Sequence, residues 1–182
     1  MITKAIILAG GTGSRLSPIT KSVNKQLLPL FDKPMIFYPL SVLMLAKIRD
    51  ILIVTNKKDK NSFSNLFGNG SNLGIKINYI EQKKANGLPE AFIIGEKFIN
   101  NKSVALVLGD NFFYGQGFTE KLGKTKKLKS GCKIFLYKVK NPQDYGTVEI
   151  KKNKIYKIKE KPKKSKSGLA ITGLYFFDKN VV

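Results

Sequence analysis

The chain has 182 residues, 42% of them hydrophobic, and a formal net charge of +21 at pH 7. This length suits one domain with a sizeable core, and the hydrophobic content excludes a disordered chain. The sequence contains no histidine, which excludes Ser-His-Asp catalysis and histidine-ligated zinc. Only two of the 33 basic residues, Arg15 and Arg49, are arginine, so the charge does not indicate base-specific nucleic-acid recognition, which favours the arginine fork.

Hydrophobic patterning predicts strands that alternate with helices over residues 4–108. Residues 40–48 carry apolar side chains on one helical face, whereas residues 104–108 are apolar throughout, as in a strand buried on both faces. The predicted elements, in order, are strand 4–9, helix 40–48, strand 50–55, helix 59–67, strand 76–82, helix 89–98 and strand 104–108. This alternation predicts an α/β, Rossmann-like fold, with a mostly parallel sheet flanked by helices.

After Gly131 the pattern changes to alternating strands separated by turns. The predicted strands are 133–139, 146–151, 154–159 and 169–177, which indicates an antiparallel extension of the sheet. Residues 161–167 form a charged loop between the last two strands. We therefore expect a single domain over residues 1–182. We also expect its C-terminal part to be missing, because no helix follows to cover the last apolar strand.

Several features that the sequence lacks indicate the cellular compartment that we expect for the protein. A strand pattern begins at Lys4, which leaves no room for a signal peptide, and no apolar run reaches the ~20 residues of a membrane helix. The single cysteine, Cys132, cannot form an internal disulfide. We interpret it as a small strand hydrophobe and not as a nucleophile. These features predict a cytoplasmic protein.

A glycine-rich loop follows the first predicted strand. Residues 10–15 read Gly-Gly-Thr-Gly-Ser-Arg, and such turns bring backbone N–H groups close to phosphate. The loop is not a Walker A motif, because no Gly-Lys-Ser/Thr follows, and Leu16 stands where a dinucleotide fingerprint has its third glycine. Taken alone, the loop is equally compatible with an ordinary tight turn.

A longer pattern is more specific. It reads Gly11-x-Gly13-x-Arg15-Leu16-x-Pro18-x-Thr20-x4-Lys25-x3-Pro29. This run resembles the signature of the sugar-phosphate nucleotidylyltransferases, and residues 24–29, 32–36 and 38–41 resemble the branch that transfers thymidylyl groups to glucose 1-phosphate. The likeness extends from residue 4 to residue 182. It implies dTTP and glucose 1-phosphate as substrates, Mg²⁺ as cofactor, dTDP-glucose for deoxysugar synthesis as product, and a homo-oligomer.

The resemblance also implies a nucleotide site. It assigns catalytic roles to Arg15, Lys25 and Asp110, with Asp110 holding the metal, and base recognition to Gln82 and Gly87 in the segment 82–88. The nucleotide-binding set is Leu8, Gly10, Gly11, Gly13, Ser14, Arg15, Lys25, Gln26, Gln82, Gly87 and Asp110. Without the resemblance, Asp110 could equally belong to an ordinary Gly-Asp-Asn turn, and Gln82 and Gly87 to a surface and a turn.

A second implied set would bind the sugar phosphate: Asn111, Tyr145, Gly146, Glu160, Lys161 and Ile171. Glu160 could accept hydrogen bonds from sugar hydroxyls, and Lys161 could face the phosphate; read alone, both are solvated members of a lysine-rich strand. The implied reaction suits a chain without histidine. Its nucleophile is a phosphate oxygen that is already ionised at neutral pH, so no side chain must remove a proton.

Three alternatives stay open at this stage: a noncatalytic sugar-nucleotide-binding module, a uridylyltransferase of the same family, and a polyanion-binding protein favoured by charge alone. The last predicts nucleic-acid affinity that survives physiological salt, beyond weak adhesion at low salt. Family members continue into a segment that supplies a second metal-binding aspartate. We therefore expect residues 1–182 alone to bind nucleotide weakly and to catalyse poorly or not at all.

Overall fold

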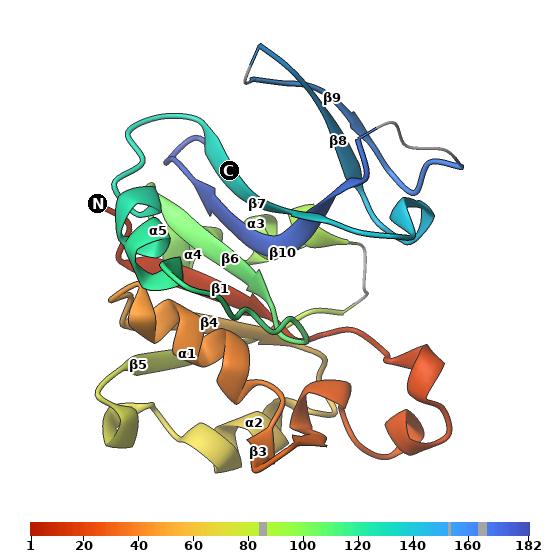
Figure 1. The fold of residues 1–182 in the computed structure, drawn as a ribbon. Helices are drawn as coiled ribbons and strands as arrows, with labels where there is room; N and C mark the ends of the chain where they lie inside the picture. The colour runs from red at the N-terminus through yellow and green to blue at the C-terminus, as the bar shows by residue number, and fades with distance from the viewer. Residues whose placement is uncertain (84–86, 153, 164–166) are drawn as a thin grey trace. The chain divides into compact units, whose positions relative to one another are not determined.

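The structure, a computed structural model, describes residues 1–83, 87–152, 154–163 and 167–182 (Figure 1). The chain forms two compact units. The first comprises Met1–Lys133 with Tyr175–Val182, and the second comprises Ile134–Leu174. Within the described residues, no helix combines the length and the apolar character needed to cross a membrane.

The first unit is built on four parallel strands. They are β1 (Lys4–Leu8), β4 (Asp50–Thr55), β5 (Lys76–Glu81) and β6 (Val104–Leu108), in the order β5-β4-β1-β6. In the parallel register Ala5 pairs with both Ile51 and Ala105. All four carboxyl ends therefore meet at one edge, where open α/β sheets place their ligand sites.

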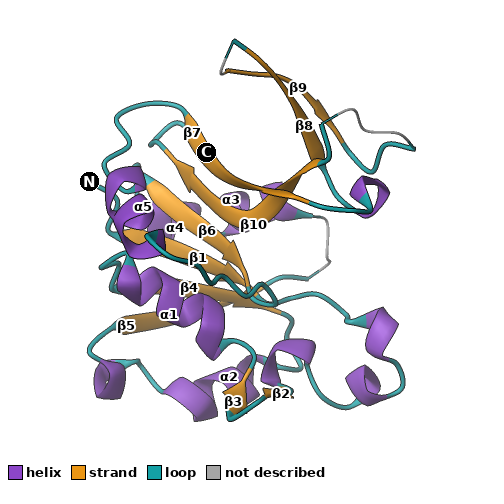
Figure 2. Ribbon diagram, viewed as in Figure 1, coloured by secondary structure: helices purple, strands orange, loops and turns teal. Residues whose placement is uncertain are grey.

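Helices cover both faces of these strands (Figure 2). The α-helices are α1 (Phe37–Leu45), α2 (Lys60–Phe67), α3 (Leu88–Ile94), α4 (Glu96–Ile99) and α5 (Phe118–Thr125). Ala91, Phe92 and Ile99 of α3 and α4 pack in one buried cluster with Ile6 and Leu52. The end of strand β10 (Leu169–Phe177) joins this cluster, since the rings of Phe92 and Phe177 lie 5.1 Å apart, edge to face.

Short elements connect the first strand to the first helix. Three 3-10 turns, η1 (Ser14–Leu16), η2 (Ile19–Lys21) and η3 (Lys25–Leu27), are followed by a hairpin of β2 (Pro29–Leu30) and β3 (Lys33–Pro34). A fourth turn, η4 (Ser71–Leu73), precedes β5. These turns and α5 were not predicted from the sequence. The 3-10 turns are too short to show a helical period.

The second unit is antiparallel. It contains most of β7 (Cys132–Lys138) and β10 (Leu169–Phe177), all of β8 (Thr147–Lys151) and β9 (Lys154–Lys159), and the turn η5 (Pro142–Asp144). Thr147 of β8 pairs with Lys159 of β9 on one side and with Ala170 of β10 on the other. The predicted fold class, a mostly parallel sheet flanked by helices with an antiparallel portion, is confirmed.

Three local predictions need correction. The helix predicted at 40–48 begins at Phe37 and ends at Leu45, because Lys47 adopts a left-handed conformation with φ 56°. The helix predicted at 89–98 is divided at Gly95, whose backbone lies so close to the sheet that a Cβ there would sit 3.3 Å from Ile6 and from Leu52. Cys132 begins β7 but is exposed, so it is not a packed hydrophobe.

Candidate active site

The glycine-rich loop leaves β1 at the carboxyl edge of the sheet. Its entry is tightly packed: Ala9 N–H donates to Val54 O at 2.7 Å, and a Cβ on Gly10 would lie 2.7 Å from Oε1 of Gln82. Gly13 has φ 62°, in the left-handed region that glycine adopts without steric cost. The loop then enters a 3-10 turn and not an α-helix, so it lacks the helix terminus of a dinucleotide-binding loop.

The backbone amides of this loop are available to a ligand. Within the described part of the chain, the N–H groups of Gly11, Thr12, Gly13 and Ser14 donate no hydrogen bond. Unpaired backbone donors are rare in folded proteins unless water or a ligand satisfies them. A run of successive N–H groups in a turn favours anions. The loop is therefore suited to bind phosphate oxygens.

The following turns fold back onto the loop. The hydroxyl of Thr20 donates to Gly13 O at 2.9 Å. A Cβ on Gly13 would lie 2.8 Å from Cγ2 of Thr20 and 3.1 Å from Cβ of Lys25. Gly13 thus permits the contact that brings Lys25, twelve positions later in the sequence, against the glycine-rich loop.

Lys25 forms an ion pair with Asp110. Its Nζ lies 2.7 Å from Oδ2 of Asp110, and the two side chains are 29% and 32% exposed. Asp110 follows β6 through Gly109, whose N–H donates to Leu8 O at 2.9 Å. A Cβ on Gly109 would lie 3.0 Å from that same carbonyl and 3.0 Å from Cγ of Gln26. Close backbone packing therefore fixes the carboxylate beside the phosphate loop.

The loop, the lysine and the carboxylate enclose a cavity of about 270 Å³. Its lining residues are Gly11, Gly13, Ser14, Arg15, Leu16, Lys25, Gln26 and Asp110. Except for Leu16, all of these belong to the predicted nucleotide set. Arg15 forms no ion pair with any described residue and is exposed. Two cations and one carboxylate give the lining a net positive charge, which favours a polyphosphate.

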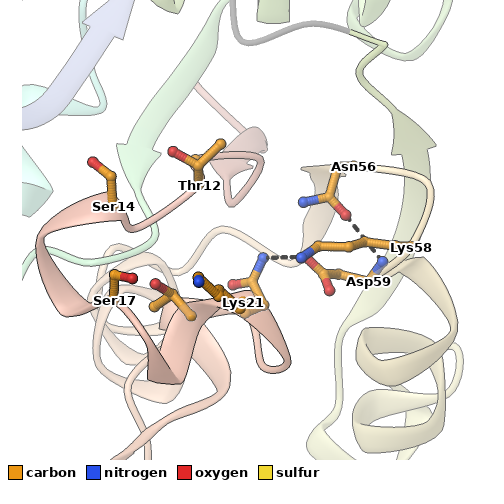
Figure 3. Close-up of a pocket in the computed structure, with 10 residues that line it drawn as sticks. Thr12, Ser14, Ser17, Lys21, Asn56, Lys58 and Asp59 are labelled. Atoms are coloured by element: carbon orange, nitrogen blue, oxygen red, sulfur yellow. Dashed lines mark hydrogen bonds between the residues drawn. The ribbon is translucent and has the colours of Figure 1, made fainter.

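A second cavity, of about 410 Å³, lies beside the same loop (Figure 3). Its lining residues are Gly11, Thr12, Ser14, Ser17, Thr20, Lys21, Asn24, Asn56, Lys58 and Asp59. Asn24 and Asp59 are buried there and are joined by a hydrogen bond of 2.7 Å. Neither was predicted from the sequence. Their only sequence signals are the position of Asn24 beside Lys25 and that of Asp59 before a helix.

The predicted base-recognition residues flank the loop. Gln82 is buried, its N–H donates to Thr55 O at 2.7 Å, and its Nε2 donates to Oε2 of Glu90 at 2.6 Å. This arrangement leaves Oε1 of Gln82 against Gly10. Gly87 has φ 90° and precedes α3. The intervening part of the predicted segment, residues 84–86, lies outside the described residues.

Asp110 is the one carboxylate among the residues that line the cavity of about 270 Å³. No group of three or more His, Cys, Asp or Glu side chains is clustered for metal binding in the described ranges. Asp110 would therefore contribute a single protein ligand at this cavity. Asn111 donates its N–H to Leu108 O at 3.2 Å and lines neither cavity.

The other predicted sugar-phosphate residues cluster in the second unit. A Cβ on Gly146 would lie 3.0 Å from Oε2 of Glu160 and 3.7 Å from Cδ1 of Ile171. Ile171 N–H donates to Gly146 O at 2.8 Å, and Lys161 N–H donates to Tyr145 O at 3.1 Å. The side chains of Glu160 and Ile171 thus lie close to Gly146, and Tyr145, Glu160 and Lys161 are exposed. Residues 164–166 of the predicted charged loop lie outside the described residues.

Comparison with known proteins gives consistent results. The nucleotidyl transferase family matches residues 4–182. The glucose-1-phosphate thymidylyltransferase of Neisseria meningitidis is 56% identical over 180 residues, which are 98% of this chain and 62% of that protein. The enzyme of the same name from Xanthomonas campestris is 50% identical over 96% of this chain and 60% of its own length. The chain thus spans about three fifths of these curated relatives.

Solved structures share the fold. A Bacillus anthracis protein assigned as a glucose-1-phosphate thymidylyltransferase, solved with sucrose, superposes with a TM-score of 0.90 at 40% identity, over 97% of this chain and 71% of that one. A UDP-glucose pyrophosphorylase in complex with UDP-glucose superposes with a TM-score of 0.82 at 28% identity, over 98% of this chain and 76% of that one.

The two loop glycines should respond differently to alanine. Gly13→Ala should lower the free energy of unfolding by about 1–2 kcal/mol, because alanine is strained at positive φ. The added methyl group would also contact Thr20 and Lys25. Gly11→Ala should change stability by less than about 0.5 kcal/mol, because no atom lies within 4 Å of its added Cβ. Urea unfolding of both variants measures the difference, and equal losses would contradict it.

Proposed function

The chain belongs to the nucleotidyl transferase family, and we propose that it transfers a thymidylyl group from dTTP to glucose 1-phosphate. The products would be dTDP-glucose and pyrophosphate. The observation that carries this proposal is the ion pair of Lys25 with Asp110 beside a loop of unpaired amides. The names of relatives at 48–56% identity support the thymidylyl and glucose assignments.

The phosphate groups of dTTP would bind at the cavity of about 270 Å³. The N–H groups of residues 11–14 would donate to the phosphate oxygens, and Arg15, which is free of ion pairs with described residues, would neutralise charge at the cavity mouth. Lys25 would exchange its carboxylate partner for a phosphate oxygen. The backbone N–H groups are held by the fold of the loop before the substrate arrives, so they would stabilise developing charge with little reorganisation.

Asp110 is the residue that would hold a divalent cation, for which we propose Mg²⁺. Its Oδ2 already accepts a cationic partner, the Lys25 ammonium at 2.7 Å, and its side chain is one third exposed to the cavity. A single carboxylate suits Mg²⁺, which usually takes its remaining oxygen ligands from phosphates and water. When bound, the metal would help neutralise the charge of the leaving pyrophosphate.

The reaction needs no general base from this chain. A phosphate oxygen of glucose 1-phosphate would form a bond to the α-phosphorus of dTTP, while the bond from that phosphorus to the bridging oxygen of the β-phosphate breaks. Pyrophosphate leaves with the bonding electrons, and no proton is transferred. The work left to the protein is in-line positioning and charge neutralisation. This requirement agrees with a sequence that has no histidine.

Base and sugar would be bound by different units. Gln82, with Nε2 held by Glu90, would direct its Oε1 toward the N3–H of thymine, and Gly87 would let the ring approach the backbone. In the second unit, Glu160 and Lys161 would bind the sugar hydroxyls and phosphate above Gly146. We propose that both units belong to one nucleotidyltransferase domain.

Pyrophosphate release from dTTP, Mg²⁺ and glucose 1-phosphate tests the proposed function. The assays use the protein at its full natural length, because residues 1–182 span about three fifths of the curated relatives. We expect turnover with dTTP to exceed turnover with UTP. Turnover with UTP alone would make the protein a uridylyltransferase, and tight sugar-nucleotide binding without any turnover would make it a binding module. Either result would contradict the proposal.

Lys25→Ala should reduce kcat by about 10²–10³-fold, the loss typical of one electrostatic contact to the transition state. The fold should be retained, since Lys25 is not part of the core. Lys57→Ala is the matched control, because it removes the same charge from an exposed position that lines neither cavity. An unchanged kcat in Lys25→Ala would remove this lysine from the catalytic site.

Gln82→Leu should weaken dTTP binding by roughly 1–3 kcal/mol, because the base would lose its hydrogen-bond partner in a buried site. Binding of glucose 1-phosphate should change little, since its proposed ligands lie in the second unit. Calorimetry with each ligand separates the two effects. Equal weakening of both would mean that Gln82 acts through the fold of the loop.

A further inference from the structure

Asn24 makes three hydrogen bonds although it is not among the groups that would contact substrate. Its Nδ2 donates to Ala9 O at 3.1 Å and to Oδ2 of Asp59 at 2.7 Å, and its Oδ1 accepts from Gln26 N–H at 2.9 Å. The side chain is 4% exposed. Asn24 thereby links three segments: Ala9 after β1, Asp59 before α2, and the backbone of Gln26, which follows Lys25.

The direction of these bonds fixes the amide of Asn24. Two acceptors, a carbonyl and a carboxylate, face Nδ2, while a backbone donor faces Oδ1. Turning the amide over would place its oxygen against both acceptors and its nitrogen against the donor. All three contacts would then be repulsive, so only one orientation satisfies the buried groups.

Asp59 is the second half of this arrangement. It is 5% exposed and stands at the N-cap of α2, where an aspartate usually accepts a hydrogen bond from an amide of its own helix. Its side chain makes no such bond and instead accepts from Asn24. The backbone of Asp59 is held by Asn56, whose Oδ1 accepts from Asp59 N–H at 3.0 Å (Figure 3). The carboxylate is thus used to hold the loop and not to cap the helix.

We infer that Asn24 and Asp59 form a positioning pair for Lys25, and this inference rests on the proposed function. Lys25 lies directly between Asn24 and Gln26, and η3 begins with it. When the Asn24 amide is held, the direction in which Lys25 leaves the backbone is held as well. The same contacts set the distance between Lys25 and Asp110. Loss of the pair would leave Lys25 charged but free to sample other directions, and catalysis is sensitive to such misplacement.

The experiment measures kcat and KM for dTTP in four proteins: wild type, Asp59→Ala, Lys25→Ala and the double variant. Asp59→Ala should lower kcat about tenfold, the range of one lost charge-assisted hydrogen bond, with a smaller change in KM. In the Lys25→Ala background the same change should lower kcat less than about twofold, because coupled residues are not additive. If Asp59 acts only through the stability of the fold, Asp59→Ala should lower kcat by the same factor in the wild-type and Lys25→Ala backgrounds.

Conservative variants separate positioning from folding. Asp59→Asn keeps an oxygen that can accept from Asn24 and should retain kcat within about twofold of the wild type. Asn24→Ser keeps an acceptor for Gln26 N–H, but it replaces the two N–H donors of Nδ2 with one hydroxyl on a shorter side chain, which cannot serve both Ala9 O and Asp59. It should therefore reproduce the loss seen in Asp59→Ala, and it replaces that variant if Asp59→Ala does not fold. Thr55→Val is the control, because Thr55 also donates to Ala9 O, at 3.4 Å, without touching the Lys25 segment.

The outcomes are distinguishable. Loss of kcat in Asp59→Ala or Asn24→Ser that disappears in the Lys25→Ala background supports the positioning pair. Unchanged kcat, a loss that persists without Lys25, or an equal loss in Thr55→Val overturns it while leaving the proposed function intact. An unchanged kcat in Lys25→Ala itself, or no turnover by the wild type, would instead remove the proposed function.

Discussion

The ion pair between Lys25 and Asp110 joins two segments that lie 85 positions apart in the chain, and the arrangement of the site depends on it. A side chain at Gly13 or Gly109 would crowd the segments that carry the two partners, since a Cβ at either position would meet its neighbours at about 3 Å or less. The glycines of the site therefore allow neighbouring segments to approach one another closely, in addition to shaping the turns. They bring a cation and an anion together beside amides that have no partner among the described residues.

The composition of the chain fits this arrangement. The chain has no histidine, which is the usual side chain for proton transfer near neutral pH, and its net charge is +21. The basic residues provide cations for a reaction in which every participant carries phosphate. Most lysines play no part in that site, and two basic residues, Arg15 and Lys25, line the cavity of about 270 Å³. Their position and not the total charge favours a nucleoside triphosphate over a nucleic acid.

The sequence predicted the strands and the fold class well, because continuous apolar runs such as residues 104–108 allow few other structures. The family resemblance also assigned one set of residues to the nucleotide site, and seven of them line the cavity of about 270 Å³. The helical pattern over residues 89–98 did not show the break at Gly95, where a Cβ would lie 3.3 Å from Ile6 and from Leu52. Nor could it predict the bond between Asn24 and Asp59, because hydrogen bonds between distant segments leave no periodic pattern.

The central claim is that Asp110 and Lys25 hold each other until nucleotide and metal arrive. A crystal structure of the protein with dTTP and Mg²⁺ tests this claim most directly. The account predicts that Nζ of Lys25 moves from its position 2.7 Å from Asp110 to a phosphate oxygen, while Asp110 turns to the metal. A complex in which dTTP is bound elsewhere, or in which the ion pair is unchanged beside the bound nucleotide, would contradict it.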